Sequence, residues 1–316
     1  MSEREIVCED LYLAIDDLRR DGFRLDLIYP ADDPHTAVLS HDGEGVRVTT
    51  RPDAQEISAE LPRFAPEFVL TRAGGSSGHG RAGMLYRDLI PGRLGGRYIA
   101  SHIAIPGGGP VSDWVHYHRI AFQIIYVRRG WVRVVYEGQG EPFVMKPGDF
   151  VLQPPLIRHR VLESSPGLEV VEIAAPAMHE TFADHAMELP NGVDRALMFG
   201  SQRFLFHVAA ETPWTPFDGG EAQETALAQA TGGLAEARTI RPGAGPIDFP
   251  PEDGELVFGF VLEGTATLEF RGEAELHSSD AFVIPPNEGW RISGASPDFR
   301  LLQVATARLD WRTSPL

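Results

Sequence analysis

The chain has 316 residues, of which 43% are hydrophobic, so it can bury a core as one large domain or as two to three smaller ones. Asp and Glu outnumber Lys and Arg by 45 to 28, and the formal charge of −17 disfavours phosphate backbones and anionic lipid. We therefore expect neither nucleic acid nor a membrane among its partners. The one cysteine, Cys8, excludes an intrachain disulfide, and "MSEREIVCED" lacks an apolar signal core. These features predict a cytoplasmic protein.

Residues 1–52 carry patterns that predict a strand, a helix and three more strands. "LYLAIDDLRRDG" has helical periodicity, "FRLDLIYPADDP" alternates up to a turn, and "TAVLSHDGEGVRVTT" is typical of a hairpin. This βαβββ order, with the "YPADDP" turn, resembles one half of a glyoxalase-type (vicinal oxygen chelate) domain. Such halves normally pair. The resemblance therefore implies pairing with another chain, and we expect a homodimer.

Residues 53–99 are predicted to be a connecting segment rich in Gly and Arg. "TRAGGSSGHGRAG" has the composition of a loop. Four arginines gather in or after it: Arg81, Arg87, Arg93 and Arg97. A basic cluster in an acidic protein could hold an anionic substrate. Salt bridging to the acidic surface is the alternative, and it is the interpretation that we favour.

Two blocks of short predicted strands follow, at residues 100–176 and 236–316. Between them, residues 177–235 are predicted to connect the blocks, with short helices in "MHETFADHAMEL" and "GGEAQETALAQA". "FQIIYVRRGWVRVVYEG" of the first block aligns with "LVFGFVLEGTATLEFRG" of the second, and "PGDFVLQPPLIRHRV" aligns with "SSDAFVIPPNEGWRI". The alignment predicts an internal repeat, and each copy has the size of a small barrel.

Four side chains in the first block form a candidate metal site. His116 and His118 are two residues apart, so on a strand they share one face. Gln123 reaches that face only if the chain turns at residues 119–121. His159 follows a Pro-Pro turn, from which a returning strand could supply a third imidazole. Three neutral nitrogens and an amide oxygen suit a first-row divalent transition metal with coordination positions left open.

The same stretch resembles a known family. "HYHRIAFQIIYVRRG" fits the first cupin motif, which is His-x-His, four residues, an acidic residue, six residues and Gly, and "PGDFVLQPPLIRH" fits the second. The chain therefore resembles a bicupin, with a layout similar to gentisate-type dioxygenases. The resemblance implies a mainly β fold of two double-stranded β-helix barrels beside the small N-terminal subdomain. It also implies that His116, His118 and His159 bind a metal. Gln123 stands where the family usually has Glu, so it is either a weaker ligand or a hydrogen-bonding residue of the pocket.

The second block lacks this set of side chains. The positions that match the four candidates of the first block are Pro250, Glu252, Val257 and Trp290. We therefore expect one metal per chain and a structural role for the second barrel.

The predicted ligands are all neutral, so the charge of a divalent metal is not compensated and favours a small anionic chelating substrate. With Fe(II), the metal that we favour, substrate and O2 can bind together. That predicts a dioxygenase acting on a hydroxy-aromatic acid, a diketone or a hydroxy acid. With Mn, Ni or Zn, the same Lewis acid could support an isomerase, lyase or aminohydrolase, and a non-catalytic small-molecule-binding cupin is the further alternative. The sequence identifies no catalytic residue outside the ligands.

Overall fold

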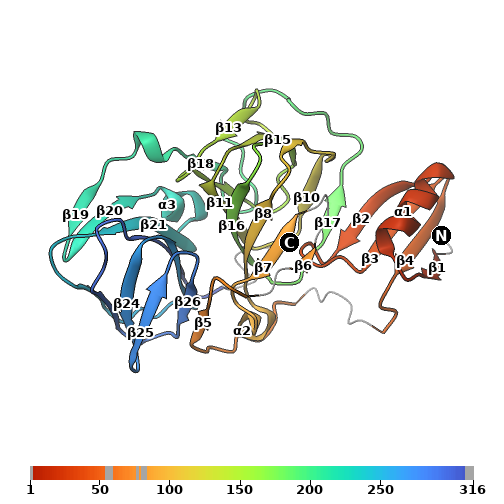
Figure 1. Cartoon of the computed structure of the whole chain (residues 1–316). Coiled ribbons are helices and arrows are strands. Elements are labelled where there is room, and N and C mark those ends of the chain that lie inside the picture. The colour runs from red at the N-terminus through yellow and green to blue at the C-terminus, as the bar shows by residue number, and fades with distance from the viewer. Residues whose placement is uncertain (1–2, 54–59, 76–77, 80–83, 310–316) are drawn as a thin grey trace.

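The computed structural model describes residues 3–53, 60–75, 78–79 and 84–309, and it shows three parts in a row (Figure 1). The first part, the N-terminal module, is β1 (Glu3–Val7), α1 (Leu11–Arg20), β2 (Arg24–Tyr29), β3 (Thr36–His41) and β4 (Glu44–Thr49). The predicted βαβββ order is confirmed, whereas the likeness to a glyoxalase half stays a prediction. None of the helices in these ranges is long and apolar enough to cross a membrane.

The helix of the N-terminal module forms for local reasons. The side chain of Asp10 caps its first turn by accepting a hydrogen bond from Leu13 N at 3.0 Å. Leu11 and Ile15 lie on one face and are buried against the sheet. The opposite face of α1 stays exposed.

The second part, the first repeat, consists of two facing sheets. Its strands are β8 (Ile99–Ile105), β9 (Gly109–Pro110), β10 (His116–His118), β11 (Phe122–Arg129), β12 (Val132–Tyr136), β13 (Phe143–Met145), β14 (Phe150–Gln153), β15 (His159–Ser164) and β16 (Leu168–Ala175). One sheet has the order β10-β15-β12-β13 and the other β14-β11-β16-β8. Apolar side chains from both sheets, such as Val134 and Val151, pack together between them.

The third part, the second repeat, has the same arrangement. Its strands are β21 (Ala235–Pro242), β22 (Ile247–Phe249), β23 (Leu256–Glu263), β24 (Thr265–Glu269), β25 (Glu273–His277), β26 (Ala281–Ile284), β27 (Trp290–Ser293) and β28 (Arg300–Thr306). The sheet orders β22-β27-β24-β25 and β26-β23-β28-β21 match those of the first repeat. Gly130 and Gly264 both have φ 75°, and a Cβ on either would lie within 2.5 Å of a serine Oγ. The predicted internal repeat and the mainly β fold class are therefore confirmed.

The two repeats pack against each other through the sheets that contain β11 and β23. Phe122 and Tyr126 of the first repeat share one hydrophobic core with Phe258 and Phe260 of the second. This core holds the first repeat from outside, so the space between its own two sheets remains available for a site.

The two segments that the sequence predicted to be connections also contribute strands to the sheets of the repeats. In residues 53–99, β5 (Val69–Thr71) pairs with β26, while β6 (Gly78–His79) and β7 (Leu85–Asp88) extend the sheet of β8, before the short α2 (Arg93–Gly96). In residues 177–235 lie β17 (Thr181–Ala183), β18 (Leu205–His207), the 3₁₀ turn η2 (Ala209–Glu211), β19 (Thr215–Phe217), β20 (Gly220–Glu224) and α3 (Leu227–Thr231).

The helix predicted in residues 178–189 is wrong. Residues 181–183 are a strand, because β17 is hydrogen-bonded between β10 and β2 and the tertiary partners override the local periodicity. The helix predicted in residues 219–230 is correct only for its end, since the first half is β20. Because β17 pairs with both β2 and β10, the sheet of the N-terminal module continues through β17 into the sheet that carries β10 (Figure 1).

Candidate metal centre

Three histidines meet on the inner face of the first repeat. His116 and His118 lie on β10, and His116 pairs with His159 of β15 across the ladder. All three are buried, and a nitrogen atom of each lies within 4.8 Å of the other two. Between the two β10 histidines, Tyr117 points to the opposite face and stacks on Phe182. The strand period therefore brings together the imidazoles that the sequence pattern predicted.

Backbone carbonyls fix the orientation of each imidazole. His116 Nδ1 lies 2.8 Å from Trp114 O, His159 Nδ1 lies 3.1 Å from Ile157 O, and His118 Nδ1 lies 3.3 Å from Glu180 O. A carbonyl only accepts hydrogen bonds, so the neutral rings of His116 and His159 carry their proton on Nδ1 and their lone pair on Nε2. His118 Nδ1 also lies 3.2 Å from Thr181 Oγ1, and its contact with Glu180 O favours the same tautomer. This arrangement is typical of imidazoles that bind a metal through Nε2.

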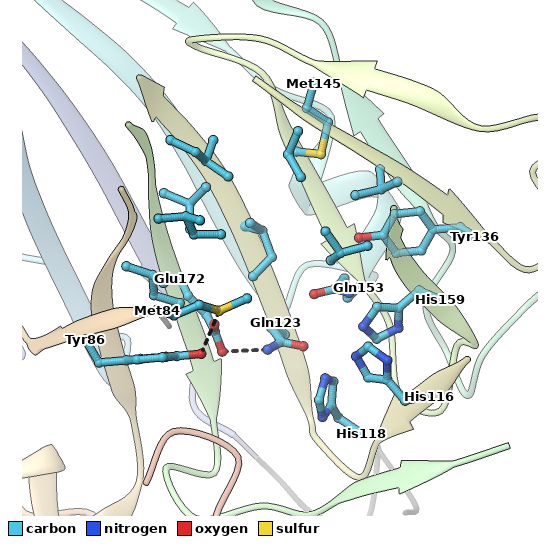
Figure 2. Close-up of a pocket in the computed structure, with 18 residues that line it drawn as sticks. Met84, Tyr86, His116, His118, Gln123, Tyr136, Met145, Gln153, His159 and Glu172 are labelled. Atoms are coloured by element: carbon cyan, nitrogen blue, oxygen red, sulfur yellow. Dashed lines mark hydrogen bonds between the residues drawn. The ribbon is translucent and has the colours of Figure 1, made fainter. Parts of the chain in front are cut away.

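Gln123 completes the polar end of the site. The chain bends at residues 119–121, as predicted, and enters β11, where Gln123 is 3% exposed. Its Nε2 donates a 2.6 Å hydrogen bond to Glu172 Oε1, so its Oε1 points towards the histidines (Figure 2). That oxygen is buried and has no hydrogen-bond partner among the described residues. A buried orphan acceptor beside three oriented imidazoles fits a cation between them.

Glu172 is the residue that the sequence analysis missed. It lies on β16 opposite Ile125, on the same face as Gln123. In β16 the inward side chains alternate, and Glu172 interrupts an apolar series that begins with Leu168 and Val170. A charged residue on the inward face of an otherwise apolar strand was the signal available in the sequence.

Two acidic side chains lie behind the neutral groups that the sequence predicted as ligands. The Glu172 carboxylate lies behind Gln123, and Asp113 Oδ1 lies 3.5 Å from His116 Nδ1. Both acids are next to groups that would hold the metal and are not themselves in the cluster of three imidazoles. They place acidic groups directly behind the candidate ligands.

The histidines lie at one end of a cavity of about 110 Å³ between the two sheets. Gln123, Gln153 and Glu172 form the polar end with them, and side chains such as Ile103, Val134, Met145 and Leu168 form the apolar walls. Figure 2 shows Met145 far from the imidazoles and Tyr136 beside His159. The cavity thus has a polar end for a metal and an apolar end.

Two further aromatic side chains support the histidines. Tyr136 stacks on His159 with ring centroids 5.4 Å apart, and burial, with the nearby Glu172 carboxylate, raises its pKa far above the usual value. The phenol therefore stays neutral. His179, which the sequence analysis did not select, lies edge-on to His118 at 5.4 Å. Burial lowers the pKa of His179, so its imidazole is neutral at pH 7.

Comparison with known families supports this description. The family model of the cupin domain matches residues 101–173, from β8 to β16. This segment is a cupin domain. No curated protein matches the chain.

Solved structures extend the likeness of the cupin domain to most of the chain. A salicylate 1,2-dioxygenase variant from Pseudoaminobacter salicylatoxidans in complex with gentisate is 18% identical, with a TM-score of 0.54 over 78% of this chain and 83% of that chain. A Pseudomonas aeruginosa protein described as glyoxylate-induced is 14% identical, with a TM-score of 0.57 over 80% and 94%. The Lactobacillus farciminis oxalate decarboxylase formate complex is 12% identical, with a TM-score of 0.52 over 81% and 88%. At these identities the likeness shows the fold.

Of the arginine cluster, the described members Arg87, Arg93 and Arg97 do not line the cavity of the cupin domain. Arg87 donates to backbone carbonyls, and Arg93 pairs with Asp32 and Asp88. Arg97 makes two 2.9 Å hydrogen bonds to the buried Glu255. Salt bridging to acidic groups at the surface, the favoured interpretation, therefore holds for Arg93. The ion pair of Arg97 with Glu255 is buried, and Arg81 lies outside the described residues.

In the second repeat, aromatic side chains fill the position that matches the third histidine. Trp290, at the position of the third histidine, stacks on Phe249 with centroids 3.7 Å apart, and Phe282 packs against it. Pro250, Glu252 and Val257 supply no metal set with Trp290, and the histidine cluster is the one grouping of candidate ligands found in the described part of the chain. Burial raises the pKa of Glu252, which disfavours its charged form. Aromatic packing thus occupies the place of the metal site.

Proposed function

We propose that this chain is a metal-dependent cupin enzyme, and specifically a dioxygenase that binds Fe(II) through His116, His118 and His159, with Gln123 as a fourth ligand. The observation that carries the proposal is the orphan Gln123 Oε1 facing three imidazoles whose Nδ1 atoms are tied to the backbone. When bound there, Fe(II) would supply open coordination positions for O2 and for a chelating substrate.

The side chains of the protein have definite tasks in this proposal. The carbonyls of Trp114, Ile157 and Glu180 keep each Nε2 lone pair directed inward. Glu172 holds the Gln123 amide so that its oxygen faces the imidazoles. The apolar walls lower the effective dielectric constant of the cavity, which strengthens electrostatic interactions at its polar end.

The cavity also restricts the substrate class. No lysine or arginine lines it among the described residues, and Glu172 already places a carboxylate in it. A cavity of about 150 Å³ is large enough for benzene, so one of about 110 Å³ suits a small compound. Of the three predicted classes, we favour a diketone that binds as its monoanionic enolate over a doubly charged hydroxy acid. The structural likeness to a salicylate dioxygenase supports oxygenase chemistry, and the likeness to an oxalate decarboxylase supports the lyase alternative.

The test is oxygen uptake by the Fe(II)-loaded protein with a panel of diketones, hydroxy acids and hydroxy-aromatic acids. His116→Ala should remove a ligand and abolish both metal binding and uptake, whereas His277→Ala, whose side chain is 55% exposed, should retain both. Turnover without oxygen uptake, with Mn, Ni or Zn, would favour an isomerase, lyase or aminohydrolase. Tight binding without turnover under any metal would favour a binding protein.

A further inference from the structure

A second cavity lies beside the metal cavity. It has a volume of about 190 Å³ and lies between the N-terminal module and the first repeat, and we call it the N-terminal cavity. Ile15 of α1 with Leu25 and Ile28 of β2 form one side, and Val111 and Trp114 form the other. The N-terminal module therefore does not only pack against the cupin domain but forms a cavity with it.

The two cavities share walls. Met84 and Val161 line both of them. Met84 is unbranched and has three rotatable side-chain bonds, so a change of rotamer can join the two spaces without moving the backbone. The N-terminal cavity and the metal cavity are thus neighbours across two side chains.

The N-terminal cavity is polar at its outer rim and mainly apolar inside, where Asp113 beside Val161 is the polar exception. Tyr12, Asp16 and Arg19 lie on the exposed face of α1 at the outer rim. Inward from them, Ile15, Leu25 and Ile28 are each at most 4% exposed and apolar. Beyond Met84 come Glu172 and Gln123 of the metal cavity and then the histidines (Figure 2). A ligand with two oxygens at one end and a hydrocarbon chain at the other matches this order.

We propose that the N-terminal cavity is a second subsite, which receives the hydrocarbon end of an amphiphilic substrate whose two oxygens face His116, His118 and His159. This inference rests on the proposed function, because it assigns the chelating end of the substrate to the metal. It makes the N-terminal module the part of the chain that selects substrates by the length of their apolar substituent.

The segment of residues 111–114, which lines the N-terminal cavity, also orients the candidate metal ligand His116. Trp114 O is 2.8 Å from His116 Nδ1, and Asp113 Oδ2 accepts a 2.9 Å hydrogen bond from Val161 N. A hydrocarbon chain of the substrate that lies against residues 111–114 therefore contacts the segment that orients His116. A ligand in the N-terminal cavity would therefore affect the orientation of His116 and, through it, the metal.

The length of the hydrocarbon chain of the ligand is the variable that tests the subsite. Acetylacetone and straight-chain homologues, lengthened by one methylene at a time, are titrated anaerobically into the Fe(II)-loaded full chain by calorimetry. Each methylene that is buried should tighten binding by about three- to fourfold. Val111→Trp fills the N-terminal cavity from the repeat, and Ile15→Phe fills it from α1. Val144→Trp, at a side chain that is 39% exposed and lines neither cavity, is the matched control.

The expected result is that affinity rises steadily along the series for the wild type and for Val144→Trp. For Val111→Trp and Ile15→Phe the rise should stop once the metal cavity is full. If one filled variant does not fold, the other still decides. Affinity that rises equally in the filled variants and the control overturns the subsite while leaving the metal site in place. If no diketone binds the loaded protein, both the subsite and the proposed substrate class are overturned.

Discussion

Replacing Gln123 with glutamate tests the centre of the site most directly. In the native protein Gln123 Nε2 donates to Glu172 Oε1 at 2.6 Å, and both groups lie inside the first repeat. Gln123→Glu removes this donor and places a second carboxylate against the first. It also restores the acidic residue that the cupin motif usually has at this position.

The cost of the change follows from the geometry. Two carboxylates about 4 Å apart repel by about 4 kcal/mol at an effective dielectric constant of about 20. Sharing one proton avoids the repulsion, but at pH 7 protonating a carboxyl of ordinary pKa, about 4.3, also costs about 4 kcal/mol. Both routes predict that the metal-free variant loses about 4 kcal/mol of unfolding free energy at pH 7.

The loss should depend on pH with a definite sign. The shared proton raises a carboxyl pKa in the folded state above its unfolded value, so the stability of the variant falls as the pH rises above about 4.3. At pH 5 the loss should be only about 1 kcal/mol. A divalent metal should bind the variant more tightly, and metal at about 100 times its Kd should restore about 2.7 kcal/mol. An anionic substrate should bind more weakly.

Urea unfolding at pH 5 and pH 7, with and without Mn²⁺, measures these free energies, and calorimetry measures the metal affinity. Gln229→Glu, at an exposed side chain of α3, controls for the change in net charge. Equal unfolding free energies for the two variants at pH 7, with unchanged metal affinity, would refute the placement of Gln123 between Glu172 and the metal.

Four further results are expected. Metal analysis should find one ion per chain, and a second ion in the second repeat would contradict the loss of its ligands. Arg97→Ala should lower the unfolding free energy by about 3–5 kcal/mol, because it leaves Glu255 buried without its cation, whereas the exposed Arg20→Ala should change it by less than about 0.5 kcal/mol. Glu172→Ala should weaken metal binding about tenfold by releasing the amide of Gln123, and unchanged affinity would remove Glu172 from this role. Sedimentation should show a homodimer, and a mass that stays monomeric at all concentrations would disprove it.

The sequence by itself predicted the repeat and the three histidines that meet in the candidate metal centre. Both depend on short-range geometry. Residues two apart on a strand share a face, which places His116 beside His118, and the Pro-Pro turn returns the chain so that His159 pairs with His116. Gln123 required only a bend over three residues. The sequence also predicted that the second repeat lacks this ligand set, since proline and tryptophan cannot replace imidazole as metal ligands.

Only the tertiary structure decided the charge and the surroundings of the site. Glu172 reaches Gln123 because β16 pairs with β11 in one register among several, and no local pattern specifies which strands become neighbours. Likewise, residues 181–183 form a strand and not a helix because β10 and β2 both offer backbone hydrogen bonds to them. That pairing also fixes the N-terminal module beside the cupin domain and forms the second cavity. These features depend on contacts between residues far apart in the chain, whose energies are set by the assembled sheets and not by the segments themselves.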